Sequence, residues 1–273
     1  MIDKPTFASK EAEIEWVFKN KDLLLLEKRN AIKHGDIVTN SIKEAVKVTT
    51  KAETTDESMI GKLKAELVIN TTNLIDSHMD CHIDGIWNKS LKELGLLYLL
   101  QEHEMEFEYV IADSVNDELK AGVKSLDWAK LGYNYQGKTQ ALIFTTTISK
   151  ERNEFMYNQY KNGYVLNHSV GMRYVKLYLC VDSDSPEYTQ EKEAWDKYYP
   201  IVVNKEVADQ KGYFWAVTEA KIVEGSAVVK GSNHATPTLS ITENKNEAVK
   251  DTSEDNKPEP SNDTQKLSIY NFN

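Results

Sequence analysis

Residues 165 to 181 read Val-Leu-Asn-His-Ser-Val-Gly-Met-Arg-Tyr-Val-Lys-Leu-Tyr-Leu-Cys-Val, and this stretch decides the fold. Read as a strand, it places Ser169, Gly171 and Arg173 on one face, because successive side chains of a strand point to opposite faces. The neighbouring His168 points to the other face. The strand therefore presents a hydroxyl, a glycine and a guanidinium side by side.

The second half of the stretch is apolar on the face of Ser169. If the alternation continues, that face goes on with Val175, Leu177, Leu179 and Val181. A hydroxyl that could act as a nucleophile would then stand at the polar end of a strand whose far end is core. A serine at the start of a strand is usually structural, so other residues must support a catalytic role.

Composition limits the classes of function. The 273 residues, 40% of them hydrophobic, can bury one substantial core plus appendages. The formal net charge of -10 argues against a general nucleic-acid binder, because phosphate binding needs clustered cations. Arg173 is one of three arginines in the chain, and its planar guanidinium is suited to holding a carboxylate or an oxyanion.

The compartment is expected to be reducing. Cys81 and Cys180 are the two cysteines of the chain, too few for a disulfide framework. The sequence contains no apolar run long enough to span a bilayer and begins with no recognisable export signal. We therefore expect a cytoplasmic protein that binds neither membrane nor nucleic acid.

The chain divides into three parts by composition. Residues 9–34 have the caps and apolar spacing of a helix, and a Lys-, Glu- and Thr-rich linker follows, so residues 1–61 are expected to be a helical N-terminal appendage and linker. Residues 62–236 carry the strand and helix patterns of the main domain. Residues 237–273 are acidic and polar, and we expect a disordered tail because such a segment buries too little apolar surface.

A base for Ser169 is suggested by residues 102–111. Glutamates alternate there with His103, Met105 and other largely apolar residues, which predicts a half-buried strand with His103 at the start of its core face. His168 is adjacent to Ser169 in sequence but points to the opposite face, so it is the less suitable base. A buried histidine paired with a backbone group would give the same pattern as a catalytic one.

A rival site lies in the stretch 76–84. In an extended conformation it would place potential metal ligands on one face, namely Asp76, His78, Asp80, His82 and Asp84. A metal bound there could activate water for hydrolysis. The spacing is not one of the standard ligand patterns, and a polar loop would look much the same.

Several short motifs occur together in a characteristic order. They are Asp84-Gly-Ile-Trp-Asn-Lys-Ser-Leu91 before a helix, the lone His103, Ser169-Val-Gly171 after a helix, and the closing Glu224-x-Ser226-x-Val228 followed by Asn233. In this order and spacing the chain resembles the prohead maturation serine proteases of tailed bacteriophages, relatives of the herpesvirus assemblins. The resemblance runs from about Leu63 to Pro237.

The resemblance implies an α+β fold in which helices surround a small, mostly antiparallel β-barrel. It also implies that Ser169 is the nucleophile, His103 the general base and Glu224 the carboxylate that orients the base. Gly171 would allow close approach of the substrate backbone, and Arg173 would contact an oxyanion or the substrate. The chain departs from the family at His168, where an apolar residue is usual, and in the closing turn Val-Val-Lys-Gly-Ser-Asn, where a proline is usual.

The implied function is a serine endopeptidase that cleaves scaffold and capsid-protein segments, and itself, during head assembly. It would act in the host cytoplasm inside the assembling prohead, as a homodimer or higher homo-oligomer, with neither cofactor nor metal. One alternative is a non-enzymatic capsid assembly or scaffold protein that keeps a protease-like barrel. The other is a metal-dependent hydrolase that uses Asp76, His78, Asp80 and His82.

Overall fold

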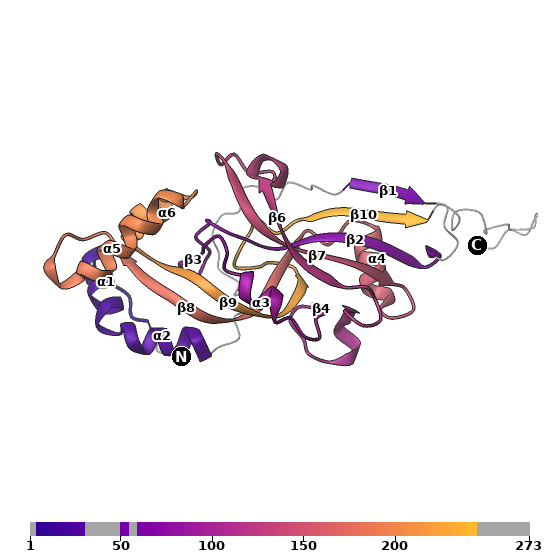
Figure 1. Ribbon diagram of the computed structural model, residues 1–273, viewed down its shortest axis with the longest axis horizontal. Helices are drawn as coiled ribbons and strands as arrows, with labels where there is room; N and C mark the ends of the chain where they lie inside the picture. The colour runs from indigo at the N-terminus through magenta and orange to yellow at the C-terminus, as the bar shows by residue number, and fades with distance from the viewer. Residues whose placement is uncertain (1–3, 31–49, 55–58, 245–273) are drawn as a thin grey trace, which may run out of the picture.

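The structure, a computed structural model, describes residues 4–30, 50–54 and 59–244. Its strands form two open sheets (Figure 1). The first sheet has, in order, β1 (Thr50–Thr54), β10 (Thr238–Asn244), β2 (Lys62–Thr71), β7 (Lys138–Ser149) and β6 (Lys120–Asp127). Neighbouring strands are antiparallel except at one edge, where β1 and β10 run parallel.

The second sheet is built around two long strands, β8 (Asn167–Val181) and β9 (Tyr213–Val228), which pair antiparallel along their length. On its other edge β9 pairs in parallel with two short strands, β3 (Asp80–His82) and β4 (Tyr98–Gln101). β5 (Val110–Asp113) lies antiparallel beside β4. The predicted strand at Ser169 is therefore confirmed, with a long partner that carries Glu224.

The α+β class is confirmed, but the predicted barrel is wrong for the part of the chain that the structure describes. A barrel requires the two edge strands of one sheet to meet. Here one edge of β9 is shared between two separate short strands, and the sheets remain open. The pair β8–β9 extends beyond the first sheet as an arm, and helices gather at its far end (Figure 1).

The N-terminal helix prediction is confirmed in position and corrected in form. Two helices, α1 (Lys10–Lys19) and α2 (Lys21–Asn30), replace the single predicted helix, and they meet at Asn20. The Ser9 hydroxyl caps α1 by accepting from the Ala12 amide at 3.2 Å. Both helices pack along the arm rather than forming a separate appendage (Figure 1). The predicted end at Gly35 lies outside the described residues.

The remaining α-helices of the described ranges are short. They are α3 (Asn88–Lys92), α4 (Glu154–Lys161), α5 (Thr189–Tyr198) and α6 (Lys205–Lys211). α4 packs on the first sheet, whereas α5 and α6 lie at the end of the arm (Figure 1). None of the helices in the described ranges has the length and apolar character that a bilayer span requires.

A paired strand lies beyond the predicted C-terminal boundary of the main domain. β10 lies beyond position 237, where a disordered tail was predicted, and it is paired between β1 and β2. Ile241 of this strand is buried. Leu239 packs partly buried against another apolar cluster. Composition alone missed the strand, because it is mostly polar and is stabilised by pairing on both edges. Residues 245–273 lie outside the described residues.

A bulge at Val175 changes which residues of β8 face the core. Val175 is an extra residue between Tyr174 and Lys176, both of which pair with β9. The buried face therefore consists of Val170, Met172 and Tyr174 before the bulge and Leu177, Leu179 and Val181 after it. The prediction that the apolar second half shares the face of Ser169 is wrong, because the bulge resets the alternation.

Candidate active site

His103 lies in a tight turn after β4. Glu102 and His103 have φ of 50° and 64°, a left-handed conformation that is uncommon for residues other than glycine. The turn is held by the Glu102 amide, which donates to the Ala227 carbonyl at 2.9 Å, and by the Val229 amide, which donates to the Glu102 carboxylate at 2.8 Å. Backbone strain of this kind persists where the surroundings fix it, and it is frequent at functional sites.

The predicted strand over residues 102–111 is therefore wrong. A 3₁₀ turn occupies Phe107–Tyr109, and a strand begins only at Val110. Met105 and Phe107, expected in the core, are 60% and 101% exposed. The strand was predicted because the glutamates alternate with a period of two, and because the turn contains no glycine or asparagine that would indicate it.

Glu224 contacts the imidazole of His103. The His103 Nδ1 and Glu224 Oε1 atoms are 2.6 Å apart, and both side chains are buried, with 8% and 1% of their surface exposed. A carboxylate accepts, so Nδ1–H is the donor, and the lone pair of the neutral ring is then on Nε2. This is the arrangement that a general base with an orienting carboxylate requires.

A second bulge accompanies Glu224. Gly171 of β8 pairs with Glu224 and Met172 with Ile222, so Val223 is an extra residue in β9. On the core side of β9, Gly225 faces the ring of Phe144, which a Cβ on Gly225 would approach to 2.5 Å. Glu224 therefore points away from the core, to the face where His103 lies. Bulges commonly re-aim side chains in this way beside active sites.

Gly171 provides the space that the Glu224 carboxylate occupies. A Cβ on Gly171 would lie 1.8 Å from Glu224 Oε1, a separation that no side chain could adopt. The predicted role of Gly171 was to admit a substrate backbone. The structure gives it a different use, because the carboxylate occupies the space that a Cβ would need.

Ser226 links His103 to Glu224. Its hydroxyl donates to Glu224 Oε2 at 2.7 Å and accepts from the backbone amide of His103 at 3.2 Å. Sequence reasoning assigned it no role. The Glu-x-Ser spacing could have indicated its role, because it places the side chains of Glu224 and Ser226 on one face of a strand.

Ser169 is directly opposite Ser226 in the β8–β9 pair. Paired residues of antiparallel strands project to the same face, with Cβ atoms about 4.5–5.5 Å apart. Ser169 is thus on the same face as the His103–Glu224 pair, and it is buried, with 7% of its surface exposed. The turn after β9 approaches it, since a Cβ on Gly231 would be 3.5 Å from the Ser169 Cβ. Ser169 and the His103–Glu224 pair therefore lie on the same face of the second sheet.

Arg173 lies two residues beyond Gly171, on the same face of β8 as Ser169, and it is exposed. Its partner in the strand pair is Lys221. The predicted contact of Arg173 with an oxyanion or substrate stays a prediction.

His168 points to the face opposite Ser169, as predicted; that face is the core side of β8, and His168 is fully buried. Its Nδ1 is 3.0 Å from the Thr236 carbonyl and its Nε2 is 3.0 Å from the Tyr160 hydroxyl. The carbonyl can only accept, so Nδ1 carries the proton and Nε2 accepts from the tyrosine. Burial lowers the pKa of His168 to about 4. His168 is thus a neutral histidine that ties β8 to α4 and to the segment before β10.

The acidic residues of the rival metal site are used for internal contacts. The Asp76 carboxylate accepts from the amides of His78 and Asp80 at 2.8 and 3.0 Å and thereby closes a turn. Asp84 accepts from the Thr72 hydroxyl at 2.5 Å. In the described part of the chain, no three His, Cys, Asp or Glu side chains are grouped so that they could hold a metal ion. The stretch is not one extended strand, so the predicted common face does not form.

A buried chain of polar groups runs from α2 through this loop. Lys28 forms an ion pair with Asp80, which also accepts from the Tyr174 hydroxyl at 2.8 Å. The same hydroxyl is 3.2 Å from His82 Nε2, and Asn70 donates to His82 Nδ1 at 2.8 Å. Burial lowers the pKa of His82. These groups hold the loop and α2 against the arm.

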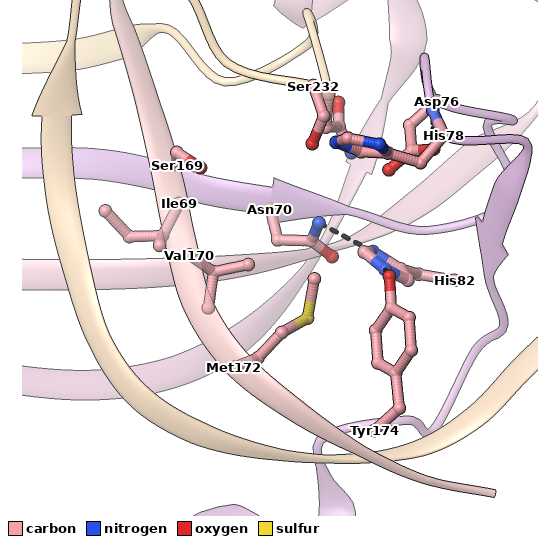
Figure 2. A pocket seen from close by; sticks show the side chains of 11 residues that line it. Ile69, Asn70, Asp76, His78, His82, Ser169, Val170, Met172, Tyr174 and Ser232 are labelled. Carbon is pink, nitrogen blue, oxygen red and sulfur yellow. Dashed lines mark hydrogen bonds between the residues drawn. The ribbon is translucent and has the colours of Figure 1, made fainter. Parts of the chain in front are cut away.

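A small polar cavity lies beside this network, between β2, β8 and the acidic loop (Figure 2). It has room for about one water molecule. Ser169 lines it together with Asn70, His78 and Ser232. Val170 and Met172, from the other face of β8, also line it, whereas His103 and Glu224 do not.

Comparison of the chain with protein-family models, with curated proteins and with solved structures found no match in any of the three.

Proposed function

We propose that this protein is a serine endopeptidase with Ser169 as nucleophile, His103 as general base and Glu224 as the orienting carboxylate. The observation that carries the proposal is the 2.6 Å contact between His103 Nδ1 and Glu224 Oε1, on the same sheet face as Ser169. A buried carboxylate that contacts an imidazole beside a serine is the constellation that activates a hydroxyl.

The chemistry follows from these positions. Ser169 Oγ attacks the carbonyl carbon of the scissile peptide and passes its proton to His103 Nε2, while Glu224 stabilises the resulting imidazolium. The imidazolium returns the proton to the leaving amine, and the C–N bond breaks to give an acyl-enzyme. Water, deprotonated by the same imidazole, then hydrolyses the ester. Arg173, exposed on this face, would contact the oxyanion or the substrate.

Substrate binding would complete the bond between the Ser169 hydroxyl and His103. Catalytic hydrogen bonds are often long in an enzyme without substrate and tighten in the complex. The exposed side chains of Met105 and Phe107, close in sequence to His103, are available to contact a polypeptide.

The resemblance to phage prohead proteases supplies the biological proposal. The substrates would be scaffold and capsid-protein segments, and the chain itself, inside an assembling prohead in the host cytoplasm. A homodimer or higher homo-oligomer belongs to the same proposal.

The test is covalent labelling of the purified protein with a peptidyl phosphonate, followed by mapping of the modified residue. We expect one label on Ser169, lost in Ser169→Ala and strongly reduced in His103→Gln. His168→Asn is the matched control, because it changes the other histidine near Ser169 and should still label. The genes beside this one should be examined for capsid and scaffold proteins; co-expression with such proteins should give cleaved chains with the wild type and uncleaved chains with Ser169→Ala.

The alternatives make different predictions. A non-enzymatic assembly protein would take no label, and normal processing of the capsid chains by Ser169→Ala would exclude Ser169 as the nucleophile. A metal hydrolase is disfavoured by the internal contacts of Asp76, Asp80 and His82. Loss of cleavage on treatment with a chelator, together with unchanged cleavage by Ser169→Ala, would support the metal hydrolase instead.

A further inference from the structure

Ser226 is buried in the middle of the second sheet, with none of its surface exposed. It lies between Ser169 of β8 on one side and Leu100 of β4 on the other. A hydroxyl in such a place costs free energy unless its hydrogen bonds are made inside the protein. Its two bonds go to Glu224 and to the His103 backbone.

The Glu224 carboxylate depends on this hydroxyl. Each of its oxygens has one hydrogen-bond partner among the described residues, His103 for Oε1 and Ser226 for Oε2. With 1% of its surface exposed, Glu224 cannot replace a lost donor with bulk water. Gly171 has no side chain to press on the carboxylate, so its two hydrogen bonds, to His103 and to Ser226, limit its rotation.

The backbone of His103 depends on the same hydroxyl. The amide of His103, in the left-handed turn, donates to Ser226 Oγ at 3.2 Å. A serine hydroxyl has one proton and two lone pairs, so both bonds can be made at once. The side chain of the base is thus fixed at Nδ1 by Glu224, and its backbone is fixed by the residue that holds Glu224.

We infer that Ser226 is a positioning residue whose hydroxyl holds both the His103 backbone and the Glu224 carboxylate, and thereby sets the orientation of the base. Ser226 is not a second nucleophile, because none of its surface is exposed to a substrate. The catalytic part of this inference rests on the proposed function, whereas the structural part, that Ser226 orients the His103 ring, does not.

The first test is nuclear magnetic resonance of the His103 imidazole in the full-length protein. Ser226→Ala should shift the His103 ring signals. Ser90→Ala is the matched control, because Ser90 is also a buried serine that accepts from a β9 amide, that of Ile222 at 2.8 Å. Equal His103 spectra in the two variants would overturn the inference, whether or not the protein cleaves peptides.

The second test is kinetic. Ser226→Ala should lower kcat by about 10- to 100-fold with KM within about twofold, because one hydrogen bond to a buried charge is lost. In a Glu224→Gln background the same change should cost less than about threefold, since residues that act as a unit are not additive. Losses that multiply in the double variant would contradict a role through Glu224.

Ser226→Thr decides the matter if the alanine variant does not fold. It keeps the hydroxyl, so it should retain the His103 spectrum and most of the activity. A folded threonine variant as impaired as Ser226→Ala would show that the hydroxyl is not what matters. An inactive wild-type protein would refute the proposed peptidase while leaving the spectroscopic test of Ser226 to stand.

Discussion

Two histidines lie close to Ser169, and they are held in opposite ways. His103 contacts a carboxylate at 2.6 Å on the outer face of the second sheet. His168 contacts a carbonyl and a phenol inside the core, at 3.0 Å each. A carboxylate stabilises an imidazolium, whereas neutral partners and burial stabilise the uncharged ring. The comparison teaches that the partner, and not the distance along the chain to the serine, determines which histidine can accept a proton.

The largest effect should be the loss of peptide cleavage when Glu224, the partner of His103, is replaced by Gln. The amide keeps the shape of the side chain but removes the charge that stabilises imidazolium, so peptide cleavage should fall by about 10³-fold or more. The measurement is kcat/KM on a peptide substrate. Activity within threefold of the wild type would remove Glu224 from the site.

The next largest effect should be the loss of about 3 kcal/mol in the free energy of unfolding at low pH, and its cause is His168. Its pKa is about 4 in the folded protein and about 6.5 as a free imidazole. Between these values the unfolded chain binds more protons, so stability is full above pH 6.5 and is lost as the pH falls towards 4. Denaturant unfolding at several pH values should show a steeper loss for the wild type than for His168→Asn.

Gly171→Ala should sharpen the assignment of Glu224. The added Cβ would lie 1.8 Å from Glu224 Oε1, so the carboxylate must move away from His103 and activity should fall by about 10²-fold. Gly122→Ala is the matched control, because a Cβ there meets nothing within 4 Å. Similar kinetics for the two variants would show that the position of the carboxylate is unimportant.

The smallest effect should be on the activity of His168→Asn. Because His168 lies on the core side of β8, kcat/KM should stay within about threefold of the wild type at neutral pH. Stability should fall by about 1–3 kcal/mol, since the Tyr160 hydroxyl loses its partner. A large kinetic defect in the folded variant would return His168 to the list of candidate bases.

The sequence predicted the parts of the site that depend on strand alternation. The strand through Ser169 and the placement of His168 on the face opposite Ser169 follow from a period of two and are confirmed. Which of the two faces is the core side was not predicted correctly. His103 was suggested by the pattern of residues 102–111 and by the resemblance, and Glu224 by the resemblance; the structure shows the two side chains in contact, on the sheet face of Ser169. The turn at His103 could not be predicted, because its left-handed residues are held by contacts with β9 that are distant in sequence.

The two open sheets also could not be predicted, for a related reason. The bulges at Val175 and Val223 are fixed by pairing between β8 and β9, and local patterns do not contain that register. β10 likewise depends on neighbours on both edges. Properties of one strand were accessible from the sequence, and properties of strand pairs were not.

The bulges suggest where relatives of this chain would vary in length. Val175 and Val223 are surplus to the pairing, so a chain that lacks either one could close the gap and leave every other side chain on its present side of the sheet. Ser169 and Gly171 each pair with a residue of β9. Loss of the residue between them would instead move the side chains on one side of the deletion to the opposite face of the sheet. Thr218 is unpaired in the same way, between Val217 and Glu219. Evolutionary insertions and deletions in this arm are therefore expected at these three positions, and homologous sequences can be searched for such gaps.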